Sequence, residues 1–277
     1  FWYHPHFDTE GQVDRGLYGM LVVDEVVDEA AEEAQFLAPD SEVTLVFDTW
    51  GEVAVDATLH SHGPAFPPTT WTVNGEVRPR LELPGGTRVR ARLLNASNGA
   101  YLSLHHEGLR HIGGDQGLLP APQTPERIVM SSGDRVELEW LVGEEGFVVY
   151  SDLHTRAGAP PGEPFVLFEV AVTDPAPAPA PLALPYPGGE VSVDIARTDV
   201  LYTLQGSDRG ETWLINGETF PDVTIHSVPL GSDVFMEVRN LSPSSHPFHL
   251  HGHAFEVLSV GGIAPAWRTV EDTIDIP

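Results

Sequence analysis

An internal repeat constrains the fold of this chain more than any other feature of its sequence. The segment WTVNGEVRP starts at Trp71, and the related segment WLINGETFP starts at Trp213. After a three-residue insertion in the second copy, the correspondence continues at Gly86, Val89 and Asn95, which match Gly231, Val234 and Asn240. Recurrence of the same turn residues at this separation predicts one structural unit that is present at least twice.

The hydrophobic residues around this repeat follow a period of two, which is typical of β-strands. Alternation of polar and apolar residues marks strands at 87–94, 134–142 and 232–238, and mostly apolar runs mark more buried strands at 20–23, 43–47, 146–150 and 164–172. Many short strands separated by Gly and Pro predict β-sandwiches or barrels, so the expected fold class is all-β. Only 24–37 has a helical pattern, and we expect it to be an acidic surface connection.

Composition removes several classes of function. The chain has 41 acidic and 14 basic residues and a net charge of −27, so we expect no nucleic-acid partner. It has no cysteine, which excludes disulfides, zinc–thiolate sites and cysteine nucleophiles within these residues. No apolar run reaches the roughly 18 residues of a membrane span, and no signal peptide is recognisable. Phosphate-binding loops, serine-hydrolase elbows and the HExxH zinc motif are also missing from the sequence.

Four histidines, His246, His249, His251 and His253, lie within eight positions of an otherwise apolar stretch. In a strand, residues two apart point to the same face about 6.5 Å from each other, so His249 and His251 would serve neighbouring metals in a cluster. His246 lies an odd number of positions from both, which predicts that it faces the other side and serves a different site. His253 has the parity to join the pair, but it could equally be a packing or supporting imidazole.

A second pair of this kind, His4 and His6, opens the chain. Two such pairs can converge from separate domains on one cluster. Imidazole ligands suit copper, zinc, iron and nickel, and the lack of a carboxylate in either motif disfavours a non-haem iron site. A third pair, His60 and His62, lies in a Gly/Pro-rich loop and is interpreted as surface histidines. Five further histidines have no partner pattern and are expected to be structural or exposed: His105, His106, His111, His154 and His226.

The repeat separates function from fold. Counted from the shared asparagine, His246, His249 and His251 correspond to Tyr101, Leu104 and His106. The first copy therefore keeps the sandwich pattern without most of the histidines. Because the fold does not need them, the histidine stretch indicates a function added to one copy.

These motifs resemble those of the multicopper oxidases, and the resemblance covers nearly the whole chain. FWYHPHFDTEGQVDRGLYGMLVV is similar to the second histidine motif of that family, and HPFHLHGHAF is similar to the third. The segments VNGEVRPRLEL, RLLNAS and IGGDQGLLPAP resemble the three-domain, bacterial laccase-like members. The resemblance implies tandem cupredoxin-like Greek-key β-sandwiches. It divides the chain into the end of domain 1, a copper-free domain 2, a Pro-rich linker and domain 3, at residues 1–38, 41–173, 174–189 and 190–277.

The resemblance also implies roles for five histidines. His4, His6 and His251 would bind the type 3 copper pair, and His249 the type 2 copper, of a trinuclear cluster. His246 would bind the mononuclear blue type 1 copper. The implied activity couples one-electron oxidation of a small reducing substrate (a phenol, an aromatic amine or a metal ion) to four-electron reduction of dioxygen to water. Family members of this kind imply a periplasmic or extracellular location.

Two motifs of the family are missing from the sequence. An H-x-H motif is expected before His4 and an H-C-H motif after Pro277, and the segment from Trp213 to Pro277 is shorter than the matching segment from Trp71 to Asp174. The sequence is therefore interpreted as an internal fragment with truncated first and last domains, inactive by itself. A non-enzymatic structural protein and a copper-binding or copper-tolerance protein stay open as alternatives. The reducing substrate is not specified by the sequence.

Overall fold

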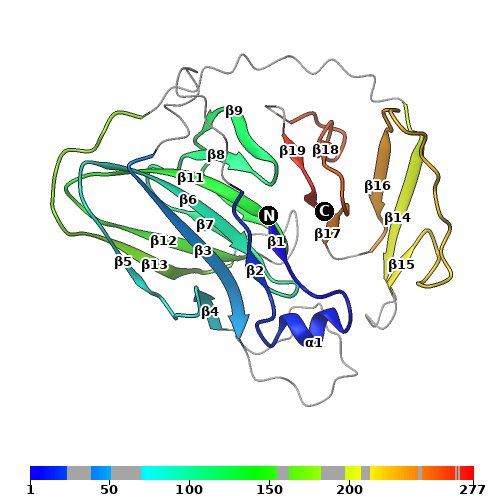
Figure 1. Cartoon of the computed structure of the whole chain (residues 1–277), viewed down its shortest axis with the longest axis horizontal. Helices are drawn as coiled ribbons and strands as arrows, with labels where there is room; N and C mark the ends of the chain where they lie inside the picture. The colour runs from blue at the N-terminus through cyan, green and yellow to red at the C-terminus, as the bar shows by residue number, and fades with distance from the viewer. Residues whose placement is uncertain are drawn as a thin grey trace.

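The computed structural model describes residues 1–23, 39–50, 70–154, 162–181, 197–206, 213–242, 245–265, 267 and 269–277. Within these residues the regular structure consists of β-strands and one short helix (Figure 1), which confirms the all-β class. The segments 24–37 and 60–62, about which the sequence analysis made predictions, lie outside the described residues. Among the described residues, no helix is long and apolar enough to cross a lipid bilayer.

The middle of the chain forms a sandwich of two sheets. The first sheet has the strand order β4-β3-β6-β11-β8-β9, with bounds Thr70–Val73, Ser41–Trp50, Thr87–Asn95, Arg135–Val142, His111–Gly114 and Gly117–Gln123. The second has the order β10-β7-β12-β13-β5, with bounds Ile128–Met130, Tyr101–His105, Phe147–His154, Pro164–Val172 and Arg80–Leu83. Strands rich in Val, Leu and Phe supply a core of fully buried side chains that includes Phe47, Leu93, Leu104, Trp140 and Phe168. Burial of these large side chains is the main stabilising contribution to the sandwich.

The strands of the second repeat copy reproduce part of this architecture. Strands β15 (Trp213–Ile215), β14 (Val200–Gly206) and β16 (Met236–Asn240) form a sheet in the order β15-β14-β16. In both copies the central strand pairs antiparallel with the strand that starts near the repeated tryptophan, and parallel with the strand that ends at the repeated asparagine. The predicted strand at 232–238 is shorter than expected, since regular pairing begins only at Met236.

The repeated Asn-Gly pair explains why the two copies share this turn. Asn74 and Gly75 have φ of 50° and 82°, and Asn216 and Gly217 have φ of 55° and 77°. These left-handed angles are accessible to Asn and Gly and match the twist of a tight hairpin. The Asn74 side chain accepts a hydrogen bond from Val46 N at 2.8 Å, and Asn216 accepts one from Thr203 N at 2.7 Å.

Both N-x-S sequences act as turns at strand ends. Strand β6 ends at Asn95, whose Oδ1 accepts hydrogen bonds from Ser97 N and Oγ at 3.1 and 2.7 Å. Strand β16 ends at Asn240, whose Oδ1 accepts the same two bonds from Ser242, both at 2.9 Å. Such Asn side chains replace backbone partners where the ladder stops.

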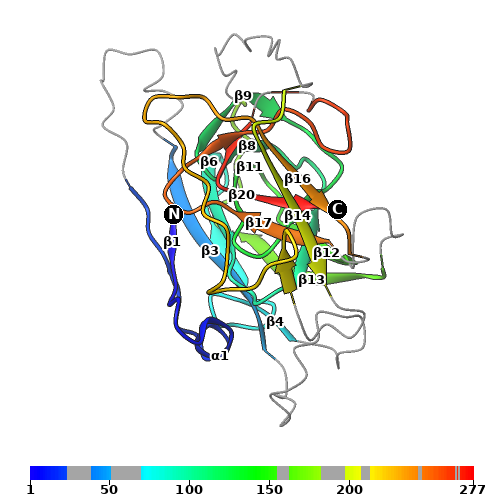
Figure 2. The ribbon, with the colours of Figure 1, turned by 90° about the vertical axis from the view of Figure 1, so that its right-hand side faces the viewer.

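The first segment packs beside the middle sandwich. Strands β1 (Trp2–Tyr3) and β2 (Gly19–Met20) pair with each other, with helix α1 (Thr9–Val13) between them. This segment lies alongside β3 in both ribbon views (Figures 1 and 2), and Tyr18 Oη donates a 2.5 Å hydrogen bond to Asp48 Oδ2 of β3. Sequence patterning missed α1, because its five residues include Gly11 and are too short to show a helical period.

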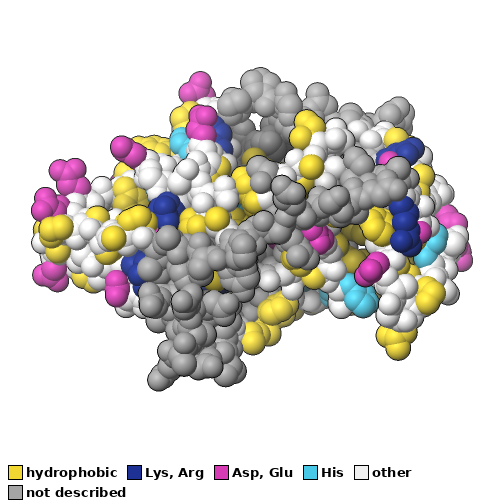
Figure 3. Space-filling model, turned by 90° about the horizontal axis from the view of Figure 1, so that it is seen from above, with side chains coloured by type: hydrophobic (Ala, Val, Ile, Leu, Met, Phe, Trp, Pro, Cys, Tyr) yellow, Lys and Arg dark blue, Asp and Glu magenta, His cyan; other side chains and the backbone are white. Residues whose placement is uncertain are grey.

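Two further strand pairs complete the regular structure of the described residues. Strand β17 (His246–His249) pairs with β20 (Thr273–Ile276), and β18 (Phe255–Glu256) pairs with β19 (Val270–Glu271). Residues 174–181 have no regular structure, as expected of a Pro-rich stretch. On the face shown in Figure 3, acidic side chains stand at several separate places, so the excess negative charge is spread out there.

Candidate metal centre

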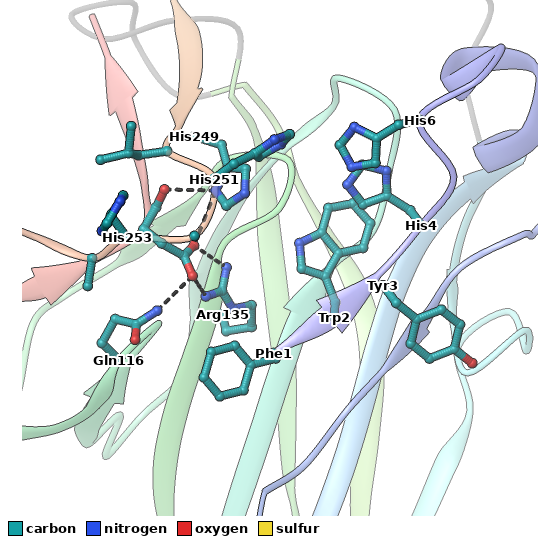
Figure 4. A pocket seen from close by; sticks show the side chains of 14 residues that line it. Phe1, Trp2, Tyr3, His4, His6, Gln116, Arg135, His249, His251 and His253 are labelled. Carbon is teal, nitrogen blue, oxygen red and sulfur yellow. Dashed lines mark hydrogen bonds and ion pairs between the residues drawn. The ribbon is translucent and has the colours of Figure 1, made fainter. Parts of the chain in front are cut away.

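A cleft of about 410 Å³ lies where the first segment of the chain meets the segment after β17. Phe1, Trp2, His4 and His6 border it on one side, and the turn 249–254 borders it on the other. Figure 4 shows the histidines of both segments facing this space, with Arg135 of β11 below them.

Five aromatic rings form a continuous row along the cleft. Trp2 stacks on His4 with ring centroids 4.2 Å apart, and His4 stacks on His6 at 4.7 Å. The edge of His6 meets His251 at 4.7 Å, and His251 meets His249 at 4.9 Å. The expected convergence of the two histidine pairs is therefore confirmed, although more than 240 residues separate them in the sequence.

The local structure of the pairs differs from the prediction that they lie within strands. Strand β1 ends at Tyr3, before His4, and β17 ends at His249, before His251. His251 lies in a turn with Gly252, whose φ of 71° is in the left-handed region. Glycine adopts this angle without the steric penalty that a Cβ atom would cause. The ring centroids within the two pairs are 4.7 and 4.9 Å apart. These distances are shorter than the roughly 6.5 Å that separates residues two apart in a strand.

Backbone and hydroxyl oxygens hold the ring of His249 from behind. Its Nδ1 lies 2.8 Å from Asp272 O and 3.1 Å from Thr273 Oγ1, and 3.4 Å from Asp272 Oδ1. The interaction with the Asp272 side chain raises the pKa of His249 above its ordinary value, although partial burial opposes the shift. With Nδ1 engaged as a donor, Nε2 is the nitrogen available to face the cleft, which is the usual support for a metal-binding imidazole.

Burial favours the neutral form of two further imidazoles of the cleft, His4 and His251. His4 Nδ1 donates to Pro5 O at 3.1 Å, and burial lowers the pKa of His4. Burial also lowers the pKa of His251, with further lowering by His249 and His6. Neutral imidazole is the form that binds a metal ion, so the environment favours the metal-binding state.

A buried ion-pair network supports the cleft from the middle sandwich, and sequence reasoning missed it. Arg135 donates to both carboxylate oxygens of Asp272, at 2.8 and 2.6 Å, and lies 3.3 Å from Asp115 Oδ1. Asp115 Oδ2 in turn accepts from the backbone N–H groups of Asp272 and Thr273, at 3.1 and 2.8 Å. The interaction with Arg135 and with His249 keeps the pKa of Asp272 well below its ordinary value despite burial. The network connects strand β11 to the residue that holds His249.

His246 lies apart from this row, as its odd spacing predicted. Its ring meets Trp213 edge-on at 5.0 Å, and its Nε2 lies 2.6 Å from Ser242 Oγ. His253 borders the same cleft as His249 and His251.

The histidines expected to be structural or exposed have ordinary surroundings where the structure describes them. His105 Nε2 lies 3.2 Å from Asp152 Oδ1, and His111 Nε2 donates to Gly113 O at 2.8 Å. His106 stacks on Phe147, and the exposed His226 meets Tyr202 edge-on. The side chain of His154 lies outside the described residues.

The donor set fits copper in chemistry but does not enclose an ion by itself. Imidazole nitrogens suit copper, and five histidines line this one cleft. Hydrogen bonds support the Nδ1 atoms of two of them, His4 and His249. Within the described ranges, however, no three His, Asp or Glu side chains are grouped so that they could hold one metal ion. The cleft therefore offers pairs of ligands rather than a closed site.

Comparison with known proteins identifies the relatives of this arrangement. The family model described as multicopper oxidase matches residues 193–277. A solved bacterial laccase-like multicopper oxidase, CueO from the lignin-degrading Ochrobactrum sp., superposes on the whole chain with a TM-score of 0.80 at 23% identity. Residues 193–277 thus resemble the multicopper oxidases in sequence, and the chain as a whole has their fold. Its all-β sandwich architecture is the fold of these oxidases, and it covers 67% of that structure.

Curated proteins with similar sequences include a multicopper oxidase and a cell division protein. The multicopper oxidase MmcO of Mycobacterium tuberculosis is 23% identical over 326 residues, which include 99% of this chain and 60% of the relative. The cell division protein FtsP of Escherichia coli is 33% identical over 143 residues, half of this chain and 30% of the relative. The chain thus spans about 60% of the length of the curated oxidase that it matches along its whole length.

Proposed function

We propose that this chain belongs to a copper-dependent oxidoreductase of the laccase type. Such an enzyme couples one-electron oxidation of a small phenol, aromatic amine or metal ion to four-electron reduction of dioxygen to water. The observation that carries the proposal is the contact between the two histidine pairs, with His6 and His251 rings 4.7 Å apart. A location outside the cytoplasm belongs to the same proposal.

Four histidines of the cleft, and His246 outside it, would bind copper in the following roles. His4, His6 and His251 would bind the type 3 copper pair, His249 the type 2 copper, and His246 the blue type 1 copper. Copper, when bound, changes oxidation state by one electron and so links single-electron donors to dioxygen. The protein's own contribution is orientation, because ligands held by supporting contacts bind metals more tightly.

Three contacts supply that orientation. Asp272 O and Thr273 Oγ1 hold the Nδ1 proton of His249, which fixes Nε2 toward the cleft. Trp2 stacks on His4 and limits rotation of its ring.

A second candidate is a non-enzymatic cupredoxin-like protein that is structural or that binds copper without turnover. The similarity of half the chain to a cell division protein favours keeping it. A blue copper site needs a cysteine thiolate, and these 277 residues contain none. By itself the chain is therefore expected to bind copper through imidazoles alone, without the intense thiolate-to-copper absorption.

A copper titration followed by calorimetry and electron paramagnetic resonance tests the ligand assignment. His4→Gln and His249→Gln should each weaken copper binding by about tenfold or more, because each removes one imidazole from a shared site. The matched control is His226→Gln, which changes an exposed histidine that does not line the cleft and should leave the affinity unchanged. Equal affinities in all three variants would show that the assigned histidines are not ligands.

Oxygen uptake separates the two candidate functions. The copper-loaded product of the complete gene should consume dioxygen in the presence of a phenolic reductant, and His249→Gln should abolish this uptake. Copper binding that depends on the assigned histidines, without oxygen uptake from phenols, aromatic amines or reduced metal ions, would establish the second candidate instead.

A further inference from the structure

The turn between strands β8 and β9 carries the segment GGDQG, to which the proposed copper ligation gives no role. This turn packs against the corner that joins β19 to β20. The backbone N–H of Asp115 donates to Glu271 Oε2 at 2.9 Å, and Gln116 Nε2 donates to Asp272 Oδ2 at 2.7 Å. A Cβ atom on Gly114 would lie only 2.8 Å from the same Glu271 oxygen, so a side chain at this position would prevent the close approach.

The carboxylate of Asp115 is surrounded by N–H donors. Its Oδ2 accepts from the backbone N–H groups of Asp272 and Thr273, at 3.1 and 2.8 Å. Its Oδ1 accepts from the backbone N–H of Arg135 at 2.9 Å, and the Arg135 guanidinium lies 3.3 Å away. The side chain of Asp115 is only 2% exposed, so these donors fix its position. Burial raises the pKa of Asp115 to about 6, which leaves the group ionised at alkaline pH.

One peptide group joins Asp115 to His249. The N–H of Thr273 and the C=O of Asp272 belong to the same peptide unit, which is planar and trans, so they point in opposite directions. The N–H meets Asp115 Oδ2 at 2.8 Å, and the C=O meets His249 Nδ1 at 2.8 Å. Because the unit is rigid, a bond that holds its N–H also fixes the direction of its C=O.

The groups along this path determine which atom donates. A carbonyl oxygen can only accept, so the proton between His249 and Asp272 O lies on His249 Nδ1. Thr273 Oγ1 donates its own proton to Asp272 Oδ1 at 2.9 Å, so it too accepts from His249 Nδ1.

The charge of Asp115 strengthens this arrangement. A carboxylate bonded to the N–H of a peptide polarises that peptide, and its carbonyl oxygen becomes a stronger acceptor. A stronger acceptor on the Nδ1 proton of an imidazole raises the basicity of Nε2, the nitrogen that is left for a metal ion.

We propose that Asp115 is a positioning residue for His249 and acts through the peptide between Asp272 and Thr273. It keeps the proton of His249 on Nδ1 and so leaves Nε2 to bind the metal. The consequence for copper rests on the proposed function, whereas the effect on the His249 ring needs no metal. The middle sandwich thereby contributes to the proposed metal centre through a residue that does not line the cleft.

The first measurement uses the unmodified chain without metal. The ¹⁵N shifts of the two ring nitrogens report which of them carries the proton, and the signals of His249 are identified by their loss in His249→Gln. At alkaline pH, once these shifts no longer change with pH, the tautomer with the proton on Nδ1 should predominate. Predominance of the other tautomer in the unmodified chain would overturn the proposal, whatever the variants show.

Asp115→Asn removes the charge and preserves the shape of the side chain. It should lower the ratio of the Nδ1–H to the Nε2–H tautomer of His249 by about fivefold, because the weakened hydrogen bond is worth about that factor. The matched control Glu271→Gln also neutralises a buried carboxylate of this turn contact but keeps an acceptor for the N–H of Asp115. It should leave the ratio unchanged. An unchanged ratio in folded Asp115→Asn, or equal falls in both variants, would also overturn the proposal.

A copper titration separates failure of this proposal from failure of the proposed function. Cu²⁺ should bind to Asp115→Asn about tenfold more weakly than to Glu271→Gln, as is typical when a group that supports a metal ligand is changed. A lower tautomer ratio with unchanged copper affinity would reject the metal-binding role of His249 and retain only its link to Asp115. An unchanged ratio together with copper binding that still depends on His249 would reject the link and retain the copper function.

Discussion

Replacing Arg135 with methionine should destabilise the protein strongly, because Arg135 neutralises two carboxylates that have little access to water. Its guanidinium contacts Asp272 twice, at 2.8 and 2.6 Å, and lies 3.3 Å from Asp115. The side chains of Arg135, Asp115 and Asp272 are 5%, 2% and 11% exposed. Methionine preserves most of the volume, so the change chiefly removes the charge.

Removal of one partner from a buried ion pair typically costs about 3–5 kcal/mol, since it leaves an uncompensated buried charge. Arg135→Met should lower the free energy of unfolding by this amount, measured by urea denaturation at pH 7. The control is Arg197→Met, which breaks a pair with Asp199 whose side chains are 53% and 34% exposed. That change should cost no more than about 1 kcal/mol. A loss of under about 1 kcal/mol in Arg135→Met would refute the reasoning.

Three further outcomes are expected. Burial and the nearby Asp115 carboxylate raise the pKa of Glu271 to about 8; its contribution to stability is therefore full below pH 4.5 and is lost as the pH rises through 8. Between pH 5 and 8 the unfolding free energy of the unmodified chain should fall by about 3 kcal/mol more than that of Glu271→Gln, and an equal fall in both would contradict this. Phe168→Ala should cost about 3–5 kcal/mol in the same denaturation assay, because Phe168 is fully buried against Phe47; a cost below about 1 kcal/mol would mean that the core collapses around the gap. Asn74→Ala should cost about 2 kcal/mol, since it loses the bond to Val46 N and puts alanine at a φ of 50°; a Tm equal to that of the unmodified chain would count against the shared-turn explanation.

Features encoded by neighbouring residues were predictable from the sequence, whereas contacts across long separations were not. The Asn-Gly turns and the strand-end asparagines depend on residues a few positions apart, so the repeat predicted them in both copies. The approach of His6 to His251 was predictable only because both lie in H-x-H pairs that need further ligands. The domain boundaries and the copper roles of the five histidines stay predictions.

The ion-pair network and the surroundings of His106 escaped sequence reasoning for a physical reason. Arg135 and Asp272 are 137 residues apart, and neither stands in a motif that marks it among the chain's many charged residues. His106 was interpreted as structural or exposed because the sequence around it shows no partner pattern. Its contact with Phe147 became visible only when β12 placed that ring beside it.

His106 and His251 show how one structural unit places an imidazole in two different surroundings. Both histidines follow the repeated asparagine at the same spacing. The ring of His106 meets Phe147 of its own sandwich, whereas the ring of His251 meets His6, which belongs to the first segment of the chain. The repeat thus determines the position of the imidazole, and the segment packed against it determines which groups the imidazole contacts. It follows that the histidine cleft depends on how the first segment is held against the sandwich, for example by the bond from Tyr18 to Asp48. A change that loosens that packing would separate the two histidine pairs without altering any histidine.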